Sequence, residues 1–456
     1  MISVSELQQR RAKYMRQMAE NSIAIFPAAR EVMRSRDTHF PFRQDSDFHY
    51  LCGIDEPDAL LILMPQEEVR EILFVLPRDP HAEVWHGRRL GCEQAQTISG
   101  VDACYPLDEL ETRLLDLLNG TDHLYFAFDS APEFEAKLRE VIRTLRAAPK
   151  RIKTAPEHWH DSRPALHQQR LVKSAGEIEL MQRAADITVQ AHKRAMQITA
   201  PGVFEYQVAA ALHHEFVHHG AVGPAYGSIV GGGENACILH YTKNSDVLRD
   251  GDLLLIDAGA EYGGYAADIT RTFPVNGKFS RVQRQIYEIV LASQEAAFAE
   301  IKPGHTLPKA QEACLHVLTE GLVKLGLLKG SVREHLDAMT VRKYFIHGLG
   351  HWLGLDVHDV GPYEQDGTPI KLRPGMVLTI EPGLYFAPDD ESVPEAYRGM
   401  GIRIEDDLLV TEQGYHNLTA AVPKSIEGIE ALMAAGSRDR TPSRGAREEG
   451  LARGAS

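Results

Sequence analysis

Residues 253–273, LLLIDAGAEYGGYAADITRTF, carry the pattern that decides how the second half of the chain folds. A β-rich run ends at Asp257, a glycine-containing turn follows, and a second β-rich run carries Asp268. A hairpin of this kind places both carboxylates on one face if the turn fits. Taken alone, the pair also fits an ordinary turn aspartate, because short motifs often match by chance. Other residues must therefore decide whether the pair binds a metal.

Residues 347–359, HGLGHWLGLDVHD, bring His347, His351 and His358 into one glycine-rich segment. The glycines favour an irregular loop over a helix. Taken alone, each histidine could instead have a structural role, with its imidazole hydrogen-bonded to backbone carbonyls. Clustered histidines, however, are typical of metal and proton-transfer sites.

Two further β-like runs carry glutamates, at MVLTIEPGLYF (376–386) and GIRIEDDLLVTEQG (401–414). Glu381 directly follows an apolar run, so its carboxylate should be at least partly buried and needs a cation or hydrogen-bond donors. In the second run, Glu405 lies on the same strand face as Arg403. Alternatively, either glutamate could lie on the solvent-exposed face of its strand and bind no metal.

Together these stretches supply four carboxylates and up to three imidazoles. Hard oxygen ligands with one imidazole suit Mn²⁺, Mg²⁺, Fe²⁺, Co²⁺ or Zn²⁺. A pair of such cations, bridged by carboxylates, makes a hydroxide nucleophile available at neutral pH. No cysteine takes part, which disfavours a structural zinc site, and no G-x-S-x-G segment supports a serine nucleophile.

Composition and charge exclude several classes of protein. A chain of 456 residues with 43% hydrophobic and 25% charged residues is globular and long enough for two domains. Its net charge of −15 disfavours nucleic acid as a partner. Five cysteines without a C-x-x-C pair indicate reduced thiols, and hence a cytoplasmic protein. The N-terminus is polar and no apolar run reaches the roughly 18 residues of a membrane span, so no membrane association is expected.

Alternating β-rich and helical segments predict an α/β domain over residues 1–172. No glycine-rich phosphate-binding motif follows any of its strands, so nothing supports a dinucleotide site. The expected strands are 22–26, 59–64, 71–76 and 123–128, and the expected helices are 5–20, 107–118 and 132–147.

Residues 173–430 predict an α+β domain, because helices and strands are grouped. Ser174 and Glu177 form a capping box at the start of its first helix. Residues 431–456 lack a packed-core composition and are expected to be disordered. The other expected helices are 204–219, 280–301, 306–326 and 331–344, and the expected strands are 225–230, 236–241, 252–257, 262–273, 375–381 and 401–411.

The ligand pattern resembles that of a known family, the pita-bread dinuclear metallopeptidases, which include methionine aminopeptidase, prolidase and aminopeptidase P. HGLGHWLGLDVHD most resembles the Xaa-Pro aminopeptidase (aminopeptidase P) branch, and RDTHFPFRQDSDFHYLCGIDEPDALLIL (36–63) is similar to the first domain of that enzyme. The resemblance covers about residues 1–430. It implies an α+β protein with an N-terminal α/β domain and a C-terminal pita-bread (creatinase/methionine aminopeptidase-like) catalytic domain. The residues that match the family's metal ligands are Asp257, Asp268, His351, Glu381 and Glu405.

The resemblance also implies a role for each of these residues. Asp268 and Glu405 would bridge two divalent cations, usually Mn²⁺ in this family. Asp257 would complete the coordination of one cation, and His351 and Glu381 that of the other. Glu381 would also accept a proton from the bridging water.

Further residues match family positions around the substrate. His240 and His358 would hold the substrate carbonyl and the developing oxyanion. The resemblance implies that some of the remaining residues shape a proline pocket. It implies that others reach the active site of a neighbouring subunit in a homodimer or homotetramer. The pocket residues are His347, Tyr385 and Arg403, and the residues reaching a neighbouring subunit are Trp85 and Asp37.

The leading interpretation is an exopeptidase that releases the first residue of Xaa-Pro-Yaa peptides by attack of a metal-bridging hydroxide. Prolidase, which cleaves Xaa-Pro dipeptides, shares all five ligands and stays open, because Arg403 could hold either a carbonyl or a terminal carboxylate. The acids of the loop 386–400 favour longer peptides, since they would repel a nearby carboxylate. A non-catalytic pita-bread binding protein is a third alternative, which the complete ligand set disfavours.

Overall fold

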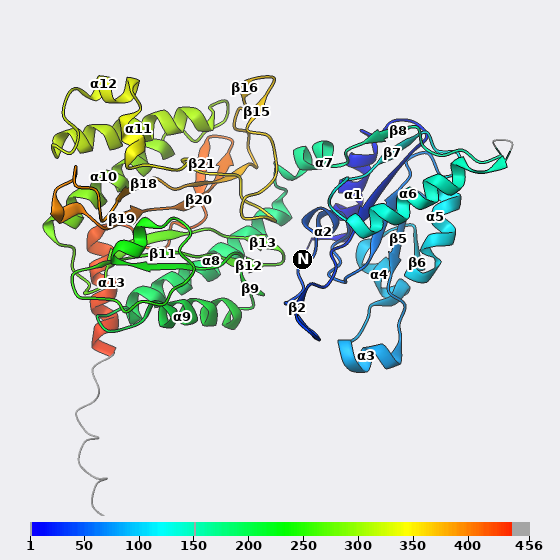
Figure 1. The fold of residues 1–456 in the computed structure, drawn as a ribbon, viewed down its shortest axis with the longest axis horizontal. Helices are drawn as coiled ribbons and strands as arrows, with labels where there is room; N and C mark the ends of the chain where they lie inside the picture. The colour runs from blue at the N-terminus through cyan, green and yellow to red at the C-terminus, as the bar shows by residue number, and fades with distance from the viewer. Residues whose placement is uncertain (1, 150–151, 440–456) are drawn as a thin grey trace, which may run out of the picture. The chain divides into compact units, whose positions relative to one another are not determined.

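The fold is described from a computed structural model that covers residues 2–149 and 152–439 (Figure 1). The chain forms two compact units. The first comprises the residues up to Glu177 together with Val360–Pro362, and the second begins at Ile178. This division lies within the first turn of helix α8 (Ala175–Ile198), whereas the sequence predicts a boundary after residue 172.

The first unit is built on a six-stranded mixed sheet in the order β6-β5-β4-β1-β7-β8. The central strand β1 pairs antiparallel with β4 and parallel with β7. The apolar runs predict four of these strands, whereas β6 and β8 lack such runs and were not expected. The strands are β1 (Ser22–Pro27), β4 (Leu60–Leu63), β5 (Glu71–Val75), β6 (Ala103–Pro106), β7 (His123–Tyr125) and β8 (His158–His160).

Helices cover both faces of this sheet, as expected for an α/β domain. On one face, α5 (Leu110–Leu118) and α6 (Pro132–Arg146) bury leucines against the strands. On the other face, α1 (Val4–Met15) packs Tyr14 edge-on against Phe26, with ring centroids 5.2 Å apart. The unit also contains α2 (Ser46–Cys52), α3 (Pro80–His86), α4 (Gly91–Ser99), α7 (Arg163–Arg170) and the hairpin of β2 (Met33–Ser35) and β3 (Thr38–His39).

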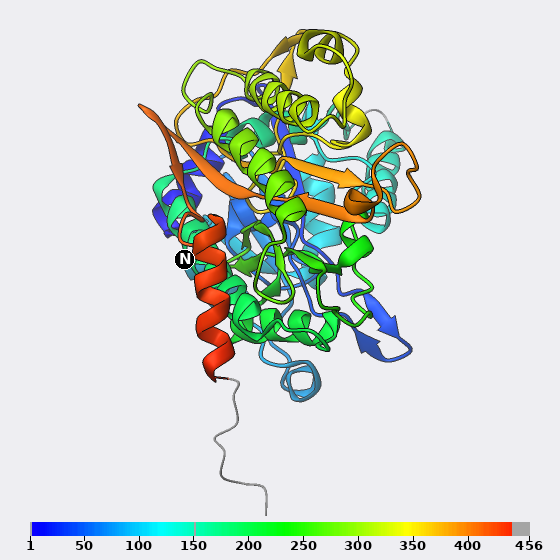
Figure 2. The ribbon, with the colours of Figure 1, turned by 90° about the vertical axis from the view of Figure 1, so that its left-hand side faces the viewer.

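Small antiparallel sheets form the centre of the second unit. Their strands lie between the α8–α9 pair and the α10–α11 pair (Figure 1 and Figure 2). Three sheets carry the candidate site: β10-β11-β14, β17-β20-β21 and β18-β19. Their strands are β10 (Ile229–Gly232), β11 (Leu253–Asp257), β14 (Thr270–Pro274), β17 (Val377–Ile380), β18 (Gly383–Phe386), β19 (Met400–Arg403), β20 (Asp406–Thr411) and β21 (Gly414–Asn417).

The remaining elements of the second unit frame these sheets. The helices are α9 (Glu205–His218), α10 (Arg281–Phe298), α11 (Leu307–Lys324), α12 (Val332–Asp337) and α13 (Ile426–Asp439). The short strands are β9 (Gly223–Pro224), β12 (Ala260–Tyr262), β13 (Tyr265–Ala266), β15 (Glu364–Gln365) and β16 (Thr368–Pro369).

The capping box expected at the start of α8 is confirmed. The backbone N–H of Glu177 donates to Ser174 Oγ at 3.2 Å, and the N–H of Ser174 donates to Glu177 Oε2 at 2.9 Å. None of the helices in residues 2–149 and 152–439 combines the length and apolarity that a bilayer crossing requires.

Four expectations about local structure are wrong. The strand expected at 262–273 is interrupted, with β13 and β14 separated by a loop over residues 267–269. The strand expected at 236–241 is a 3-10 turn (Gly233–Cys237) followed by a loop. The helix expected at 331–344 stops at Asp337, and Met339 then adopts a left-handed backbone with φ 52°. The tail expected from residue 431 is helical up to Asp439, because α13 buries apolar side chains such as Met433. Residues 440–456 lie outside the described residues.

Candidate metal centre

The β11–β14 pair brings the two aspartates of the opening motif together. Asp257 ends β11, where it lies opposite Thr270 of β14. Asp268 lies in the short loop between β13 and β14, two residues before β14. The hydroxyl of Tyr226 is 2.6 Å from Asp257 Oδ1 and also hydrogen-bonds to Asp268 Oδ1. One hydroxyl proton cannot serve both carboxylates, so this group of oxygens calls for a further proton or a cation.

The two glutamates reach the same place from the other sheets. Glu381 follows β17, and Glu405 lies between β19 and β20. Glu405 is tied to β14 twice: its backbone N–H donates to Thr270 O at 3.0 Å, and Thr270 Oγ1 donates to Glu405 Oε2 at 2.6 Å. The carboxylate of Glu405 is therefore fixed beside the aspartate pair.

His351 comes from the glycine-rich segment, which is irregular as expected. Its Nδ1–H donates to Trp352 O at 3.0 Å. Its Nε2 is thereby directed at Asp268 Oδ2, 3.5 Å away, and Glu381 Oε1, 3.6 Å away. A backbone carbonyl that fixes one ring nitrogen while the other faces carboxylates is the usual arrangement of a metal-binding histidine.

The pKa values show how strongly the buried acids repel one another. Burial, together with the charges of Asp268, Glu381 and Asp257, raises the pKa of Glu405 well above its ordinary value. Burial and Asp268 also raise the pKa of Glu381 to about 7. Burial opposes ionisation of Asp257 too, but the Arg403 charge holds its pKa below the ordinary value. Of these three carboxylates, Asp257 alone has its pKa held below the ordinary value.

The donor set fits divalent metal ions. Ligand atoms of Asp268, His351 and Glu405 lie within 4.8 Å of one another. Asp257 and Glu381 add two more carboxylates around the same space. Carboxylate oxygens with one imidazole match the preference of Mn²⁺ and similar cations, and such ions would supply the positive charge that the buried acids lack.

The metal-ligand candidates line a cavity of about 480 Å³. His240, His347 and His358 line it as well. The ring of His358 meets that of His351 edge-on, with centroids 4.3 Å apart. Burial, followed by the neighbouring His351 and His240, lowers the pKa of His358, so its imidazole is neutral near pH 7. The structure thus places the predicted catalytic histidines around the predicted ligands.

Arg403 and Tyr385, expected at a proline pocket, are engaged with protein partners. Arg403 Nη2 donates to Asp257 Oδ2 at 2.5 Å, Nη1 donates to Tyr385 Oη at 2.8 Å, and Nε donates to Thr270 Oγ1 at 3.1 Å. The Tyr385 hydroxyl in turn lies 2.8 Å from His347 Nε2. Tyr385 is buried behind the cavity lining, whereas His347 and Arg403 line it.

Trp85 and Asp37 do not belong to this cavity. Both lie in the first unit and are exposed, Trp85 to 83%. Their expected role toward a neighbouring subunit stays a prediction.

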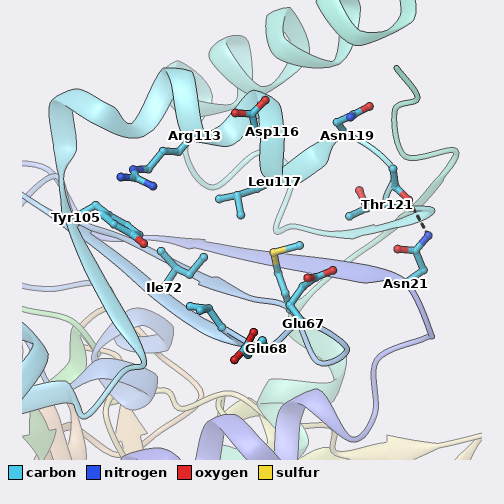
Figure 3. A pocket seen from close by; sticks show the side chains of 13 residues that line it. Asn21, Glu67, Glu68, Ile72, Tyr105, Arg113, Asp116, Leu117, Asn119 and Thr121 are labelled. Carbon is cyan, nitrogen blue, oxygen red and sulfur yellow. Dashed lines mark hydrogen bonds between the residues drawn. The ribbon is translucent and has the colours of Figure 1, made fainter. Parts of the chain in front are cut away.

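The first unit contains a cavity of its own, of about 450 Å³ (Figure 3). Its acids, Glu67, Glu68 and Asp116, are exposed, and Arg113 lies over the Tyr105 ring at 3.5 Å. The described residues that line it include no histidine or cysteine. This cavity therefore lacks the convergent, buried titratable groups that a catalytic site requires. The metal centre in the second unit is the better candidate for the functional site.

Sequence reasoning missed Tyr226. This residue lies in the segment PAYGS, where no neighbouring histidine or carboxylate marks it. Its contact with both aspartates arises only through the tertiary fold, so no sequence spacing points to it.

Comparisons with known proteins agree with this geometry. Residues 179–412 match the family described as Metallopeptidase family M24, and residues 7–125 match the Aminopeptidase P, N-terminal domain. The chain is 50% identical to the Xaa-Pro aminopeptidase of Escherichia coli strain K12 over 436 residues, which cover 95% of this chain and 98% of that protein. It is 36% identical to human Xaa-Pro aminopeptidase 3, with 87% and 78% covered.

Solved structures are similar along almost the whole chain. The aminopeptidase PepP of Pseudomonas aeruginosa superimposes with a TM-score of 0.94 at 46% identity, covering 96% of this chain and 99% of that one. A zinc-substituted aminopeptidase P of E. coli in complex with product superimposes with a TM-score of 0.93 at 50% identity, covering 95% and 99%.

Proposed function

Because the chain belongs to metallopeptidase family M24 and carries the aminopeptidase P N-terminal domain, we propose that its metal centre is the active site of an Xaa-Pro aminopeptidase. Such an enzyme hydrolyses the bond between the first residue of a peptide and a proline in second position. The observation that carries the proposal is the convergence of four buried or half-buried carboxylates and His351 on one cavity.

The five ligand candidates would hold two divalent cations, which polarise a carbonyl and lower the pKa of water at the site. We propose Asp268 and Glu405 as shared ligands. In support, the charges of Asp268, Glu381 and Asp257 all act on the carboxylate of Glu405. Asp257 would then complete the coordination of one cation, and Glu381 and His351 would complete that of the other.

The protein side chains supply the proton transfers and the substrate contacts. Glu381 takes a proton from the attacking water on a carboxylate oxygen and returns it to the proline nitrogen as the peptide bond breaks. His240 and His358 donate N–H groups to the substrate carbonyl oxygen and to the negative charge that develops there.

The contacts of Arg403 favour an aminopeptidase over a prolidase. A prolidase must bind the carboxylate of the proline itself, and the sequence suggests Arg403 for that contact. Each of its three guanidinium nitrogens already donates to a protein oxygen, and its charge is paired with Asp257, so Arg403 is less suited to bind a substrate carboxylate. The expected repulsion from the loop 386–400 is a weaker argument, because Asp390 pairs with Lys343 at 2.7 Å.

Mn²⁺ is the proposed metal, supported by the predominance of carboxylate oxygens in the donor set.

A homodimer or homotetramer is proposed because Val84 and Trp85 of α3 expose apolar side chains, which is typical of a contact surface. The five cysteines are all free thiols, which supports a reducing, cytoplasmic location.

Substrate turnover tests the proposal. We expect kcat/KM to be higher for Xaa-Pro-Yaa tripeptides than for matched Xaa-Pro dipeptides, with release of the free first residue. Replacing the proline by alanine should lower kcat/KM sharply, and N-terminal acetylation should abolish cleavage. Faster hydrolysis of the dipeptides would identify a prolidase instead.

A further inference from the structure

His240 lies in a segment that no β-ladder holds in place. Residues 233–246 leave the sheet after β10 and return before β11, and they contain one 3-10 turn and a loop. Ile238 is 54% exposed and His240 is exposed beside the cavity. An irregular exposed segment needs side-chain contacts to hold a catalytic group in one position.

Glu205, the first residue of α9, supplies such contacts from a fully buried position with 0% exposure. Its Oε1 accepts from the backbone N–H of Gly232 at 2.8 Å and from Asn235 Nδ2 at 3.0 Å. Its Oε2 accepts from the Tyr241 hydroxyl at 2.8 Å and from the backbone N–H of Asp246 at 2.9 Å. All four donors are neutral, and all belong to this segment or border it.

These contacts fix both ends and the middle of the segment at one point. Gly232 directly precedes the segment, Asp246 is its last residue, and Tyr241 is the residue next to His240 in the chain. The Tyr241 ring is also packed in an apolar cluster with Ile229 and Tyr385. Consecutive Cα atoms are about 3.8 Å apart, so fixing Tyr241 also restricts His240.

We propose that Glu205 is a positioning residue that holds His240 at the active-site cavity through the segment 233–246. The inference rests on the proposed function, because it assumes that His240 contacts the substrate. Glu205 itself touches neither substrate nor metal ligands. An ionised carboxylate is needed, because only an acceptor-only group can receive four hydrogen bonds from donors.

Glu205→Gln is the direct test, since it keeps the size of the side chain but turns one acceptor oxygen into a donor nitrogen. That nitrogen would face two donors and loosen the segment. We expect kcat and kcat/KM for an Xaa-Pro-Yaa peptide to fall together by about 10–100-fold, because loss of a transition-state contact lowers both equally. Metal content should not change. Glu234→Gln, at an exposed position in the same segment, is the matched control and should leave kcat unchanged.

A double-mutant cycle with His240→Ala separates positioning from a general structural effect. If Glu205 acts through His240, the Glu205→Gln change adds no further loss in the His240→Ala background. An equal loss in both backgrounds would overturn the inference. If Glu205→Gln does not fold, Tyr241→Phe replaces it in the same double-mutant cycle, because this change removes a single hydrogen bond to Glu205. Full activity of His240→Ala alone would instead refute the proposed role of His240, and would do so whatever Glu205 does.

Discussion

Glu381→Gln should stabilise the metal-free protein while it weakens metal binding. In the absence of metal, burial and the neighbouring Asp268 raise the pKa of Glu381 to about 7 from an ordinary 4.5. An acid with a raised pKa in the folded state stabilises that state at low pH. This contribution is lost as pH rises from 4.5 through 7. Above pH 7 the folded protein must hold an ionised carboxylate among other buried acids, and a neutral amide removes that cost.

The size of the effect follows from the pKa shift. Each pKa unit corresponds to about 1.36 kcal/mol, so a shift of this size costs the metal-free protein about 3 kcal/mol at pH 8 and less than 1 kcal/mol at pH 5. A change of 1 kcal/mol moves the unfolding midpoint by about 2–4 °C in a domain of roughly this size. The variant should therefore unfold about 6–12 °C higher than the wild type at pH 8, with a much smaller difference at pH 5.

Thermal unfolding with a chelator and then with Mn²⁺ measures both halves of the prediction. A ligand at 100 times its Kd stabilises a protein by about 2.7 kcal/mol, and the variant should gain less than the wild type because it lacks one ligand carboxylate. Glu412→Gln is the control, since Glu412 is exposed in the β20–β21 turn. A Glu381→Gln protein that is less stable than the wild type in chelator at pH 8 would refute the electrostatic account of the site.

The other predictions concern histidines and can be tested on the same preparations. His351→Ala should lose bound metal, whereas His358→Ala should keep it and lower kcat by about 10²–10³-fold; the reverse pattern would exchange the two roles. His192 is fully buried, its Nε2–H donates to Ala258 O at 3.0 Å, and burial lowers its pKa to about 4. Because the unfolded histidine binds its proton at higher pH, this site should cost the wild type about 2 kcal/mol between pH 7.5 and pH 5. In chelator, His192→Gln should show a smaller fall in the unfolding midpoint over that range, and equal falls would contradict the assignment.

The ligand set could be predicted because the carboxylates end or follow apolar strands. Asp257 and Glu381 each close such a run, and their distance along the chain from Asp268 and Glu405 matches a known family pattern. The comparisons confirm that family and the proline-specific branch. The apolar runs of β1, β4 and β5 likewise predict the core of the first sheet.

Features that depend on distant contacts could not be predicted. The apolar residues of the segment 236–241 predict a strand, but side chains bind the surrounding chain in place of a ladder: Glu205 accepts from Tyr241 and Asp246, and Asn244 accepts from Val230. The short strand β8 contains two histidines and a tryptophan, and it forms only because β7 offers it an edge. The engagement of Arg403 with Asp257 likewise follows from tertiary packing and not from the position of Arg403 on its strand.

The central claim is that Asp257, Asp268, His351, Glu381 and Glu405 form a metal-dependent peptidase centre. Metal content and Xaa-Pro-Yaa turnover, measured on the same samples as chelated protein is titrated with Mn²⁺, test it most directly. We expect no activity without metal, full activity at two ions per chain, and a loss of both metal and activity in Asp268→Asn. Full turnover at zero metal content would contradict the claim.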